Sequence, residues 1–422
     1  MPRRTFRTSH WRRSPSRIAT IAAALLTRPG ALPAQTHAEA PAQTAIPTRA
    51  VDSTAMIAPG VQYRYLVDPA GPWRVHLLRI DLTNRALRLR HVRAGDSLRS
   101  RERTSTMAAR LNTTGTRVLA AVNADFFDLA TGENENNQVV AGEWWKGLPV
   151  TDSPFDTFDN THAQLAITQR GQPVIDRFQL DGAVWAHGVR TPVLTVNAFS
   201  TGIHEGTALF TPRFGATTPR DSVRITMAAP LVRVGTRGDT LLYRRTGPLL
   251  RTGGTPIPAN GAVLTAFGAR TRELEPMADG DTVRVLLTTR PRLPDNRPPA
   301  LLIGGWPQIL RDGQNVAPVT AVTEGTISRN AETRHPRTAV ARSRDGRTLW
   351  LYVVDGRSTA SVGMTLVELA DRLRALGAWQ ALNFDGGGST AMVINGRVVN
   401  TPSDPTGERA VGNALLLLHT PP

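Results

Sequence analysis

The chain has 422 residues, of which 40% are hydrophobic and 20% charged, and it contains no cysteine. These values are typical of a globular protein and exclude a largely disordered chain, while the lack of cysteine excludes disulfides and thiol chemistry. The formal net charge of +16 raises the question of nucleic-acid binding. Residues 1–34 hold seven arginines and no acid, so the rest of the chain carries only +9, scattered along its length. We therefore expect affinity for anions and no nucleic-acid partner.

The N-terminal segment has the composition of an export signal. Six arginines between Arg3 and Arg17 precede an apolar run, Ile18 to Leu26, which is too short to span a bilayer. We interpret residues 1–34 as a signal peptide with some twin-arginine character, against the alternative of a basic tail, and residues 35–54 as a flexible leader. This predicts a periplasmic or extracellular protein whose mature form has no transmembrane span.

Residues 55–422 are predicted to form one β-rich α+β domain with a mixed sheet and few helices. Three continuous apolar runs indicate buried strands: Val118 to Val122, Thr348 to Val354 and Trp379 to Phe384. Between about 150 and 300, short strand-like runs alternate with Gly, Pro and Thr turns. This pattern favours a β-rich elaboration of the core over a second compact domain.

A strand–helix–strand unit is predicted near the C-terminus. Thr365 and Glu368 have the spacing of a capping box, and the apolar stripe that follows ends at Gly377. Such a crossover places its two strands parallel. The strand that ends before Asp355 and the strand that ends before Asp385 should therefore reach the same edge of the sheet.

The stretch after the last of these strands combines a carboxylate with consecutive glycines and hydroxyls. It reads Asp385, Gly386, Gly387, Gly388, Ser389, Thr390. Three glycines are costly in chain entropy, but they let backbone N–H groups point into one concavity that suits an anion. The alternative is a tight turn capped by Asp385.

Two more segments are expected at the same edge. Asn123 closes the strand that begins at Val118, as the aspartates close theirs, although Asn and Asp also favour strand ends as turn formers. Arg337 offers a planar donor fork for phosphate or carboxylate, and His335 could donate to the same anion. The alternative for this second segment is a surface turn with solvated arginines.

An acidic loop follows Asn123. Asp125, Asp128, Glu133 and Glu135 could hold a divalent cation such as calcium through oxygen ligands. Their spacing does not match a calcium-binding loop, and a solvated acidic loop is the alternative. No cofactor is required by the sequence, and Asp125 and Asp128 are the candidate ligands if a metal binds.

The motifs occur together in a fixed order. They are Asn123-Ala124-Asp125-Phe126-Phe127, His335-Pro336-Arg337-Thr338-Ala339, Val354-Asp355-Gly356-Arg357 and Asn383-Phe384-Asp385-Gly386-Gly387-Gly388-Ser389-Thr390. As a set they resemble the phosphodiester glycosidase family, and the similarity extends from about Val61 to Leu418. One departure is Ala124, where many relatives have glycine. The resemblance implies hydrolysis of the sugar–oxygen bond of a glycosyl-1-phosphodiester.

The resemblance also implies roles for individual residues. The leaving group would be a phosphate monoester, whose second pKa of about 6 lets it depart with little help from a general acid. Asp385 is the expected nucleophile or water-activating base, with Asp355 as second choice and Asn123 holding sugar hydroxyls or water. The expected substrate-binding set is His335, Arg337, Thr338, Arg357, Gly386, Gly387, Gly388, Ser389 and Thr390.

The sequence therefore predicts an exported hydrolase that acts on phosphodiester-linked glycans or cell-envelope polymers. The alternative is a non-catalytic protein that binds anionic exopolysaccharide through its arginines. A P-loop kinase or a dinucleotide enzyme is excluded, because neither glycine-rich signature follows a strand.

Overall fold

The computed structural model describes residues 50–151, 153, 156–199, 204–221 and 224–420. These residues belong to the compact unit Ile46–Pro422. The predicted signal peptide and most of the predicted leader lie outside the described residues. The predicted end of the leader at residue 54 is wrong, because β1 (Val51–Ala58) begins at Val51 and pairs with the next strand.

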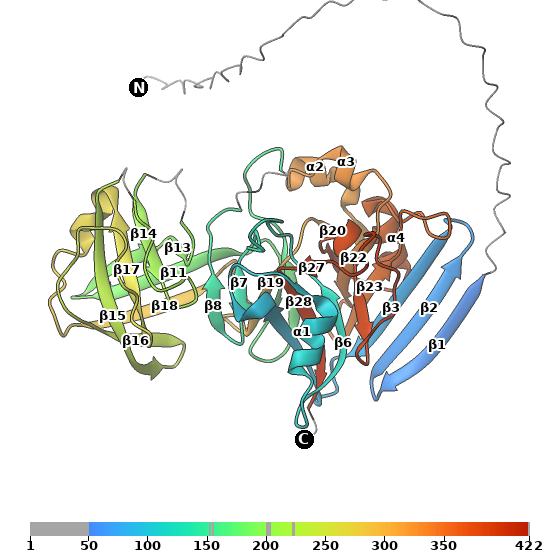
Figure 1. The fold of residues 1–422 in the computed structure, drawn as a ribbon, viewed down its shortest axis with the longest axis horizontal. Coiled ribbons are helices and arrows are strands. Elements are labelled where there is room, and N and C mark those ends of the chain that lie inside the picture. The colour runs from blue at the N-terminus through green and yellow to red at the C-terminus, as the bar shows by residue number, and fades with distance from the viewer. Residues whose placement is uncertain (1–49, 152, 154–155, 200–203, 222–223, 421–422) are drawn as a thin grey trace, which may run out of the picture. The chain divides into compact units, whose positions relative to one another are not determined.

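An eight-stranded sheet carries the strand ends that precede Asp355 and Asp385, whereas Asn123, which was expected at the same edge, ends a strand of a different sheet (Figure 1). Its order is β1, β2 (Val61–Asp68), β3 (Trp73–Asp81), β23 (Thr348–Val354), β22 (Arg337–Arg342), β24 (Gln380–Asn383), β20 (Gln308–Arg311) and β21 (Gln314–Asn315). β22 pairs antiparallel with both β23 and β24. β23 and β24 are therefore parallel to each other, as the crossover predicted, but β22 lies between them.

A five-stranded sheet packs on one face of the first sheet. Its order is β26 (Arg397–Val398), β25 (Met392–Ile394), β6 (Arg117–Asn123), β28 (Asn413–His419) and β4 (Leu87–Arg93), and a two-stranded sheet of β5 (Glu102–Arg103) and β27 (Ala410–Val411) lies apart from it. Leu415 and Leu417 share a core with Leu78 of the first sheet, whereas Leu416 packs with Met107 of α1 (Thr104–Leu111). The leucine run of β28 is thus buried on both of its faces.

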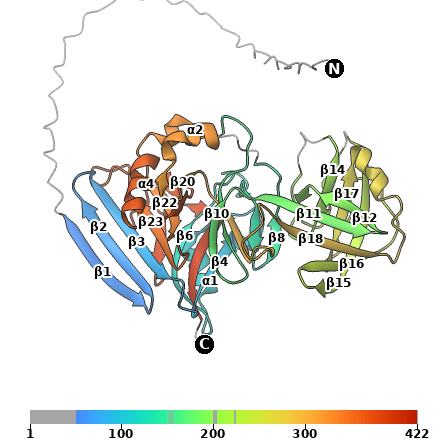
Figure 2. The ribbon, with the colours of Figure 1, turned by 180° about the vertical axis from the view of Figure 1, so that it is seen from behind.

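The opposite face of the first sheet is covered by α4 (Leu366–Ala375). The predicted capping box is confirmed, because the Glu368 N–H donates to the Thr365 hydroxyl and the Thr365 N–H donates to the Glu368 carboxylate. Leu369 and Leu373 pack against Trp350 of the sheet. The short helices α2 (Thr320–Thr323) and α3 (Ser328–Ala331) lie near the end of the sheet at which β22 begins (Figures 1 and 2). None of the helices in the described residues is long and apolar enough to cross a bilayer.

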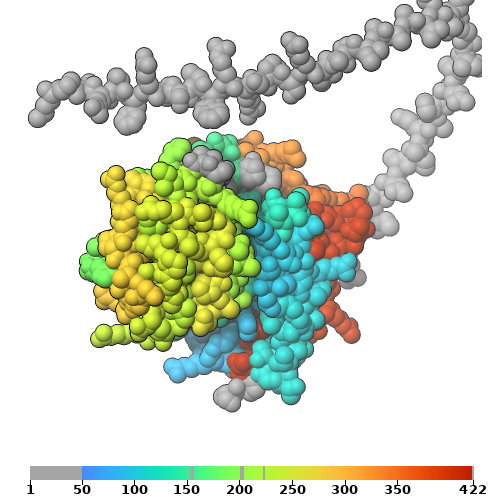
Figure 3. Space-filling model, turned by 60° about the vertical axis from the view of Figure 1, so that its left-hand side comes forward, coloured from blue at the N-terminus to red at the C-terminus, as the bar shows by residue number. Residues whose placement is uncertain are grey.

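The middle of the chain adds two more sheets. One has the order β10 (Pro173–Asp176), β9 (Gln164–Ile167), β19 (Leu301–Gly304), β7 (Gln138–Val140) and β8 (Glu143–Lys146). The other has the order β12 (Val189–Val193), β11 (Gln179–Ala186), β18 (Thr282–Arg290), β16 (Thr240–Arg245), β15 (Thr226–Arg237), β17 (Gly261–Phe267), β14 (Gly206–Phe210) and β13 (Thr195–Val196). Figure 3 shows the protein from the side of the sheet that contains β11 to β18.

The sheet that spans residues 179–290 is joined to the rest by packing. Its core includes Val139, Trp144 and Leu302 of the neighbouring five-stranded sheet. Its strands pair antiparallel except for the parallel pair β13 and β14, which makes the sheet mixed. The predicted β-rich α+β fold with few helices is confirmed.

Candidate active site

A cavity of about 450 Å³ lies where β22 begins and β24 ends. Among its described lining residues Asp385 is the one acid, and it is accompanied by the arginines Arg329, Arg337, Arg357 and Arg409. Three residues that were predicted to share a site, Arg337, Arg357 and Asp385, thus meet in one cavity although they come from separate segments.

The end of β24 brings Asp385 into this cavity. The Phe384 N–H donates to the Thr338 carbonyl at 2.8 Å, and the Asp385 N–H donates to the Ala124 carbonyl at 2.7 Å. The chain is thereby fixed to β22 on one side and to the residue after β6 on the other. The position of the carboxylate is set by backbone hydrogen bonds on both sides.

The environment of Asp385 holds its pKa close to neutrality. Burial raises the pKa of this carboxyl to about 6, while a hydrogen bond with the Ser389 side chain and the charges of Arg409 and Arg357 act in the opposite direction. The side chain is only partly buried. It therefore changes charge within the range in which a general base or nucleophile is useful.

Each of the three glycines meets a different steric demand. A Cβ on Gly386 would lie 2.7 Å from the Pro336 carbonyl oxygen, and one on Gly388 would lie 2.1 Å from Arg409 Nη2. Gly387 has a φ of 60°, and a Cβ there would lie 2.8 Å from Arg357 Nη2. The glycines allow the backbone and two arginines to approach the carboxylate closely.

Two of the three glycine amides, those of Gly386 and Gly387, are engaged within the protein, and an anion site at this turn stays a prediction. The Gly387 N–H donates to the Pro336 carbonyl at 2.9 Å, and the Ser389 and Thr390 N–H groups close the 3₁₀ turn η4 (Gly387–Ser389) at 3.2 Å. The Gly386 N–H interacts with the Asp385 carboxylate. Because these donors are already used, the positive charge that an anion would meet in the cavity is that of its arginines.

Arg337 is a buried cation bonded only to backbone carbonyls. Its guanidinium donates to the carbonyls of Met364 at 2.9 Å, Asn330 at 2.6 Å and Thr333 at 2.9 Å. No acidic side chain in the described residues forms an ion pair with it. Burial, followed by the charge of Arg357, lowers the pKa of Arg337, but a guanidinium remains charged at neutral pH. An anion in the cavity would supply the missing counter-charge.

The other three arginines differ in how much of their charge is already balanced. Arg409 forms a two-pronged ion pair with Asp404, at 2.7 and 2.9 Å. Arg357 makes one long bond to the Ser403 hydroxyl, 3.5 Å, and neither it nor Arg329 has an acidic partner in the part of the chain that the structure describes. When the charge of Arg409 is set against that of Asp404, the other three arginines and an ionised Asp385 leave the described lining with a net charge of +2.

His335 lines the cavity as predicted, but as a neutral group. Its Nε2 lies 2.7 Å from the Thr333 hydroxyl. Burial and then the charge of Arg337 lower its pKa. Gly356 and Gly363 pack closely against the segment that carries His335. A Cβ on either glycine would lie within 2.6 Å of the backbone of His335 or Pro336.

Asn123 and Thr338 lie behind Asp385 instead of facing the cavity. Asn123 Nδ2 donates to the Asp385 carbonyl at 2.6 Å, and its Oδ1 accepts from the Thr338 hydroxyl at 2.8 Å and the Ala391 N–H at 3.1 Å. Both side chains are buried and neither lines the cavity. Their predicted contacts with substrate stay a prediction, and what the structure shows is that Asn123 is bonded to both the Asp385 backbone and the Thr338 hydroxyl.

Asp355, the second choice for the catalytic carboxylate, is also absent from the cavity lining. Its side chain is buried, and its Oδ1 accepts from the Asn400 amide at 3.3 Å and the Thr401 N–H at 3.0 Å. Its Oδ2 lies 3.7 Å from His76 Nε2. Its position directly after β23 correctly predicted the edge of the sheet at which it lies. The loop that follows β25 and β26, however, covers its side chain.

The two hydroxyls after the glycines are buried as well. Ser389 lies between Asp385 and Arg409, whose Nη1 is 3.4 Å from the Ser389 hydroxyl. Thr390 Oγ1 has no hydrogen-bond partner in the described residues. Ser389 can orient Asp385, whereas Thr390 does not reach the cavity.

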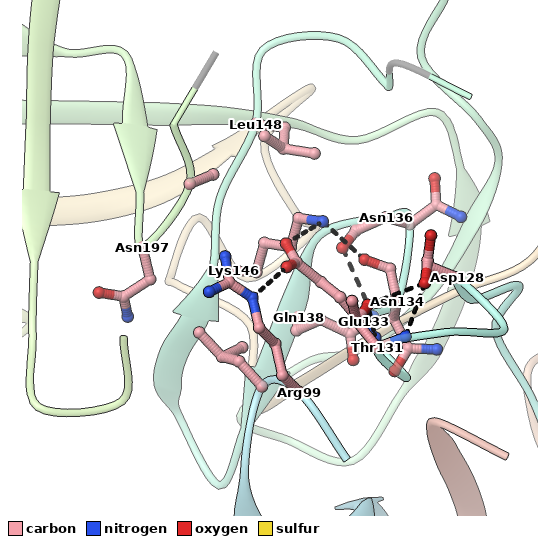
Figure 4. Close-up of polar contacts among 12 residues, drawn as sticks. Arg99, Asp128, Thr131, Glu133, Asn134, Asn136, Gln138, Lys146, Leu148 and Asn197 are labelled. Carbon is pink, nitrogen blue, oxygen red and sulfur yellow. Dashed lines mark hydrogen bonds and ion pairs between the residues drawn. The ribbon is translucent and has the colours of Figure 1, made fainter. Parts of the chain in front are cut away.

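The acids of the loop after β6 are hydrogen-bonded within the protein, as Figure 4 shows for Asp128 and Thr131. Both oxygens of Asp125 accept from side-chain amides, those of Asn136 and Gln138, each at 2.7 Å. Asp128 accepts the Thr131 N–H at 2.7 Å. No group of three or more His, Cys, Asp or Glu side chains in the described residues is arranged to hold a metal ion.

The remaining acids of this loop have other partners. Glu133 forms ion pairs with Arg99 at 2.9 Å and with Lys146, the one lysine of the chain, at 3.0 Å (Figure 4). Burial raises the pKa of Glu135 to about 7, and the nearby charges of Asp125 and Asp385 add to the shift. Glu135 therefore responds electrostatically to the charge of the cavity carboxylate.

Several cavity residues were missed by the sequence analysis. Arg409 belongs to no motif, and only the spatial proximity of Gly388 identifies it. Trp306 follows two glycines, and a Cβ on Gly305 would lie 2.7 Å from the Asn383 carbonyl oxygen. The glycine pair before Trp306 was the sequence feature that could have indicated this residue. Phe126 and Phe127 were noted only as part of a motif.

The β-rich fold holds an arginine-lined cavity that suits an anionic ligand, and comparison with known proteins shows what the chain is similar to. Residues 232–418 match the model of the family described as phosphodiester glycosidase. Mouse N-acetylglucosamine-1-phosphodiester alpha-N-acetylglucosaminidase is 30% identical over 159 residues, which are 36% of this chain and 29% of that protein. The predicted resemblance to the phosphodiester glycosidase family is thereby confirmed over residues 232–418.

Solved structures confirm the fold over most of the chain. A crystal structure of a hypothetical protein from Synechocystis has a TM-score of 0.67 at 22% identity and covers 87% of this chain and 64% of its own. A protein of Burkholderia pseudomallei whose name proposes that it is exported has a TM-score of 0.61 at 23% identity, over 82% of this chain and 74% of its own. The chain spans less than a third of the length of the mouse relative.

Proposed function

We propose that this protein hydrolyses the sugar–oxygen bond of a glycosyl-1-phosphodiester. The family match supports glycosidase-type hydrolase activity. The observation that carries the proposal is the cavity itself, in which one partly buried carboxylate, Asp385, lies among three arginines that have no acidic partner among the described residues. Such a site suits a substrate that is already an anion and becomes more negative as it reacts.

The charge balance follows the reaction. A phosphodiester carries one negative charge, and the phosphate monoester that leaves carries two above its second pKa of about 6. A lining charge of +2 therefore matches the departing group better than the bound substrate. Fixed cations that stabilise charge as it develops lower the barrier, because their interaction strengthens in the transition state.

Asp385 is the group that acts at the anomeric carbon. As a nucleophile it would form a glycosyl–enzyme bond that water then breaks, which retains the anomeric configuration. As a base it would take a proton from water that attacks directly, which inverts the configuration. In both cases the glycosidic oxygen stays with phosphorus, and the departing monoester needs no strong acid.

The cellular setting belongs to the same proposal. The basic N-terminal segment followed by a short apolar run supports export, and phosphodiester-linked glycans or cell-envelope polymers are the substrates that an exported enzyme of this kind would meet. No residue described above requires a metal ion for the step at Asp385, and added calcium is an arm of the test.

Hydrolysis of methyl N-acetylglucosamine-1-phosphodiester by the full chain in ¹⁸O-labelled water tests the reaction. We expect methyl phosphate and free sugar with the label on the sugar, with or without calcium and with or without chelator. Label on the phosphate would show phosphorus–oxygen cleavage and contradict the proposal. Saturable binding of an anionic polysaccharide without any released sugar would favour the non-catalytic alternative.

A further inference from the structure

The active-site cavity has an apolar wall in addition to its arginines. Phe126, Phe127, Leu129, Ile327 and Leu366 all line it. Neutral hydrogen-bonding side chains are fewer, and one of them, Asn383, already donates to the Trp306 carbonyl at 2.7 Å. A sugar could stack on the aromatic part of this wall, Phe126 and Phe127, but it would leave the aliphatic part, Leu129, Ile327 and Leu366, in contact with water.

The apolar surface continues outside the cavity. Leu129 lines the cavity and is still 57% exposed, and two further side chains on adjoining segments, Phe158 and Val322, are 43% and 81% exposed. We call these three residues the apolar rim. Exposed large apolar side chains are individually ordinary, but a group beside a cavity marks a binding surface.

Two residues of the apolar rim, Phe158 and Val322, lie on segments that adjoin the cavity wall. The Thr157 N–H donates to the Gly325 carbonyl at 3.0 Å, and a Cβ on Gly325 would lie 3.4 Å from Phe158 Cε1. Val322 lies in α2, four residues before Thr326, which lines the cavity together with Ile327. Figures 1 and 2 both show α2 near the end of the sheet that carries the cavity.

We propose that the substrate is an amphiphile, a glycosyl phosphodiester whose aglycone is an alkyl chain that lies along the apolar rim. This inference rests on the proposed function. Arginines that hold a phosphate next to an apolar strip are complementary to a lipid phosphodiester, in which charge and hydrocarbon are adjacent. Sugars, by contrast, are recognised by hydrogen-bonding side chains and aromatic faces, which the rim lacks apart from Phe158.

Two substrates with the same sugar and phosphate but different aglycones test the inference. The methyl and octyl diesters of N-acetylglucosamine-1-phosphate are compared with the full chain, the octyl compound below its critical micelle concentration. We expect a KM at least about tenfold lower for the octyl compound, because burial of a few methylenes contributes that much. The kcat should be similar, since the reacting bond is unchanged.

A rim variant and a matched control assign the preference to the rim. The double variant Phe158→Ser, Val322→Ser should bring the octyl-to-methyl ratio of KM close to one. Val189→Ser removes a valine that is 46% exposed, close to the 43% of Phe158, from β12 on the distant sheet and should leave both KM values unchanged. Equal KM values for the two substrates in the unaltered protein would overturn the inference, as would an octyl preference that survives in the double variant.

The test separates this inference from the proposed function. If the methyl compound is hydrolysed and the octyl compound is no better, the glycosidase proposal stands and the amphiphile is overturned. If neither compound is hydrolysed, both fail. If the double variant loses binding to phospholipid vesicles that contain no glycosyl phosphodiester but keeps the octyl preference, the rim contacts a membrane and not the aglycone, which also overturns the inference.

Discussion

Two aspartates of this protein occupy equivalent places in the sheet but different environments. Asp355 follows β23 and Asp385 follows the end of β24, and these two strands, which are parallel to each other, flank β22 and pair antiparallel with it. Asp385 lines the cavity among arginines, whereas Asp355 is buried under Asn400 and Thr401. Position at a strand end therefore does not decide whether a carboxylate can meet a ligand.

The residues after each aspartate make the difference. After Asp385 the three glycines add no side chains, so the carboxylate remains uncovered on the cavity side. After Asp355 the chain turns at Arg357, which has a φ of 61°. Arg357 and not Asp355 then reaches the cavity. From one strand end the site receives a carboxylate, and from the other it receives a cation.

Replacing Asp385 with Asn tests the comparison most strongly. We expect kcat to fall by about 10²–10⁴-fold, because the amide can neither attack carbon nor accept a proton from water. The stability of the folded protein should not decrease. Folding raises the pKa of this carboxyl from 3.8 to about 6, so the native state loses stability as pH rises through that window, and a neutral amide avoids the loss. A variant with full activity would remove Asp385 from the mechanism.

Replacing Arg337 with Met asks whether the arginines bind the leaving group. We expect kcat/KM to fall by about 10²–10³-fold, the usual effect of removing one preorganised donor. Inorganic phosphate should also bind more weakly, which calorimetry measures without any turnover. Arg237→Met, an exposed arginine at the end of β15, is the matched control. Unchanged phosphate affinity in Arg337→Met would show that this guanidinium only supports the three carbonyls.

The local parts of this architecture could be predicted from the sequence. The capping box of α4 depends on residues three apart, and the adjacent pair Asn395-Gly396, a sequence typical of a tight hairpin turn, has φ of 48° and 78° between β25 and β26. Such signals need no information from distant segments. The same holds for buried strands marked by continuous apolar runs.

The burial of individual site residues could not be predicted in this way. Asn123 is fixed by Asp385, 262 positions away, and Asp355 is covered by Asn400, 45 positions away. Neither partner leaves a local signal at the residue that it contacts. The insertion of β22 between β23 and β24 is equally non-local. A residue type at a strand end therefore predicts the edge of the sheet but not which side chains face the cavity.

The pH dependence of the reaction should report the environment of Asp385. Because burial raises its pKa to about 6, the carboxylate is ionised above that pH and protonated below it. We expect kcat/KM to be level above about pH 7 and to fall about tenfold per pH unit well below pH 6. A profile that stays level down to pH 4 would mean that the essential carboxylate has an ordinary pKa and is a different residue.

The smallest effect on catalysis is expected from Asp355→Asn, which is the same substitution at the matching strand end. The amide keeps the shape of the side chain, but it removes the charge that accepts hydrogen bonds from Asn400 and Thr401, so we expect a loss of about 1–2 kcal/mol in the free energy of unfolding. Urea denaturation measures this loss, and kcat at a temperature where the variant is folded should stay within about tenfold of the original. Asp385→Asn should thus mainly lower the activity, whereas Asp355→Asn should mainly lower the stability. If Asp355→Asn were fully stable and inactive, the buried aspartate would take part in the reaction, and the contrast between the two strand ends would be wrong.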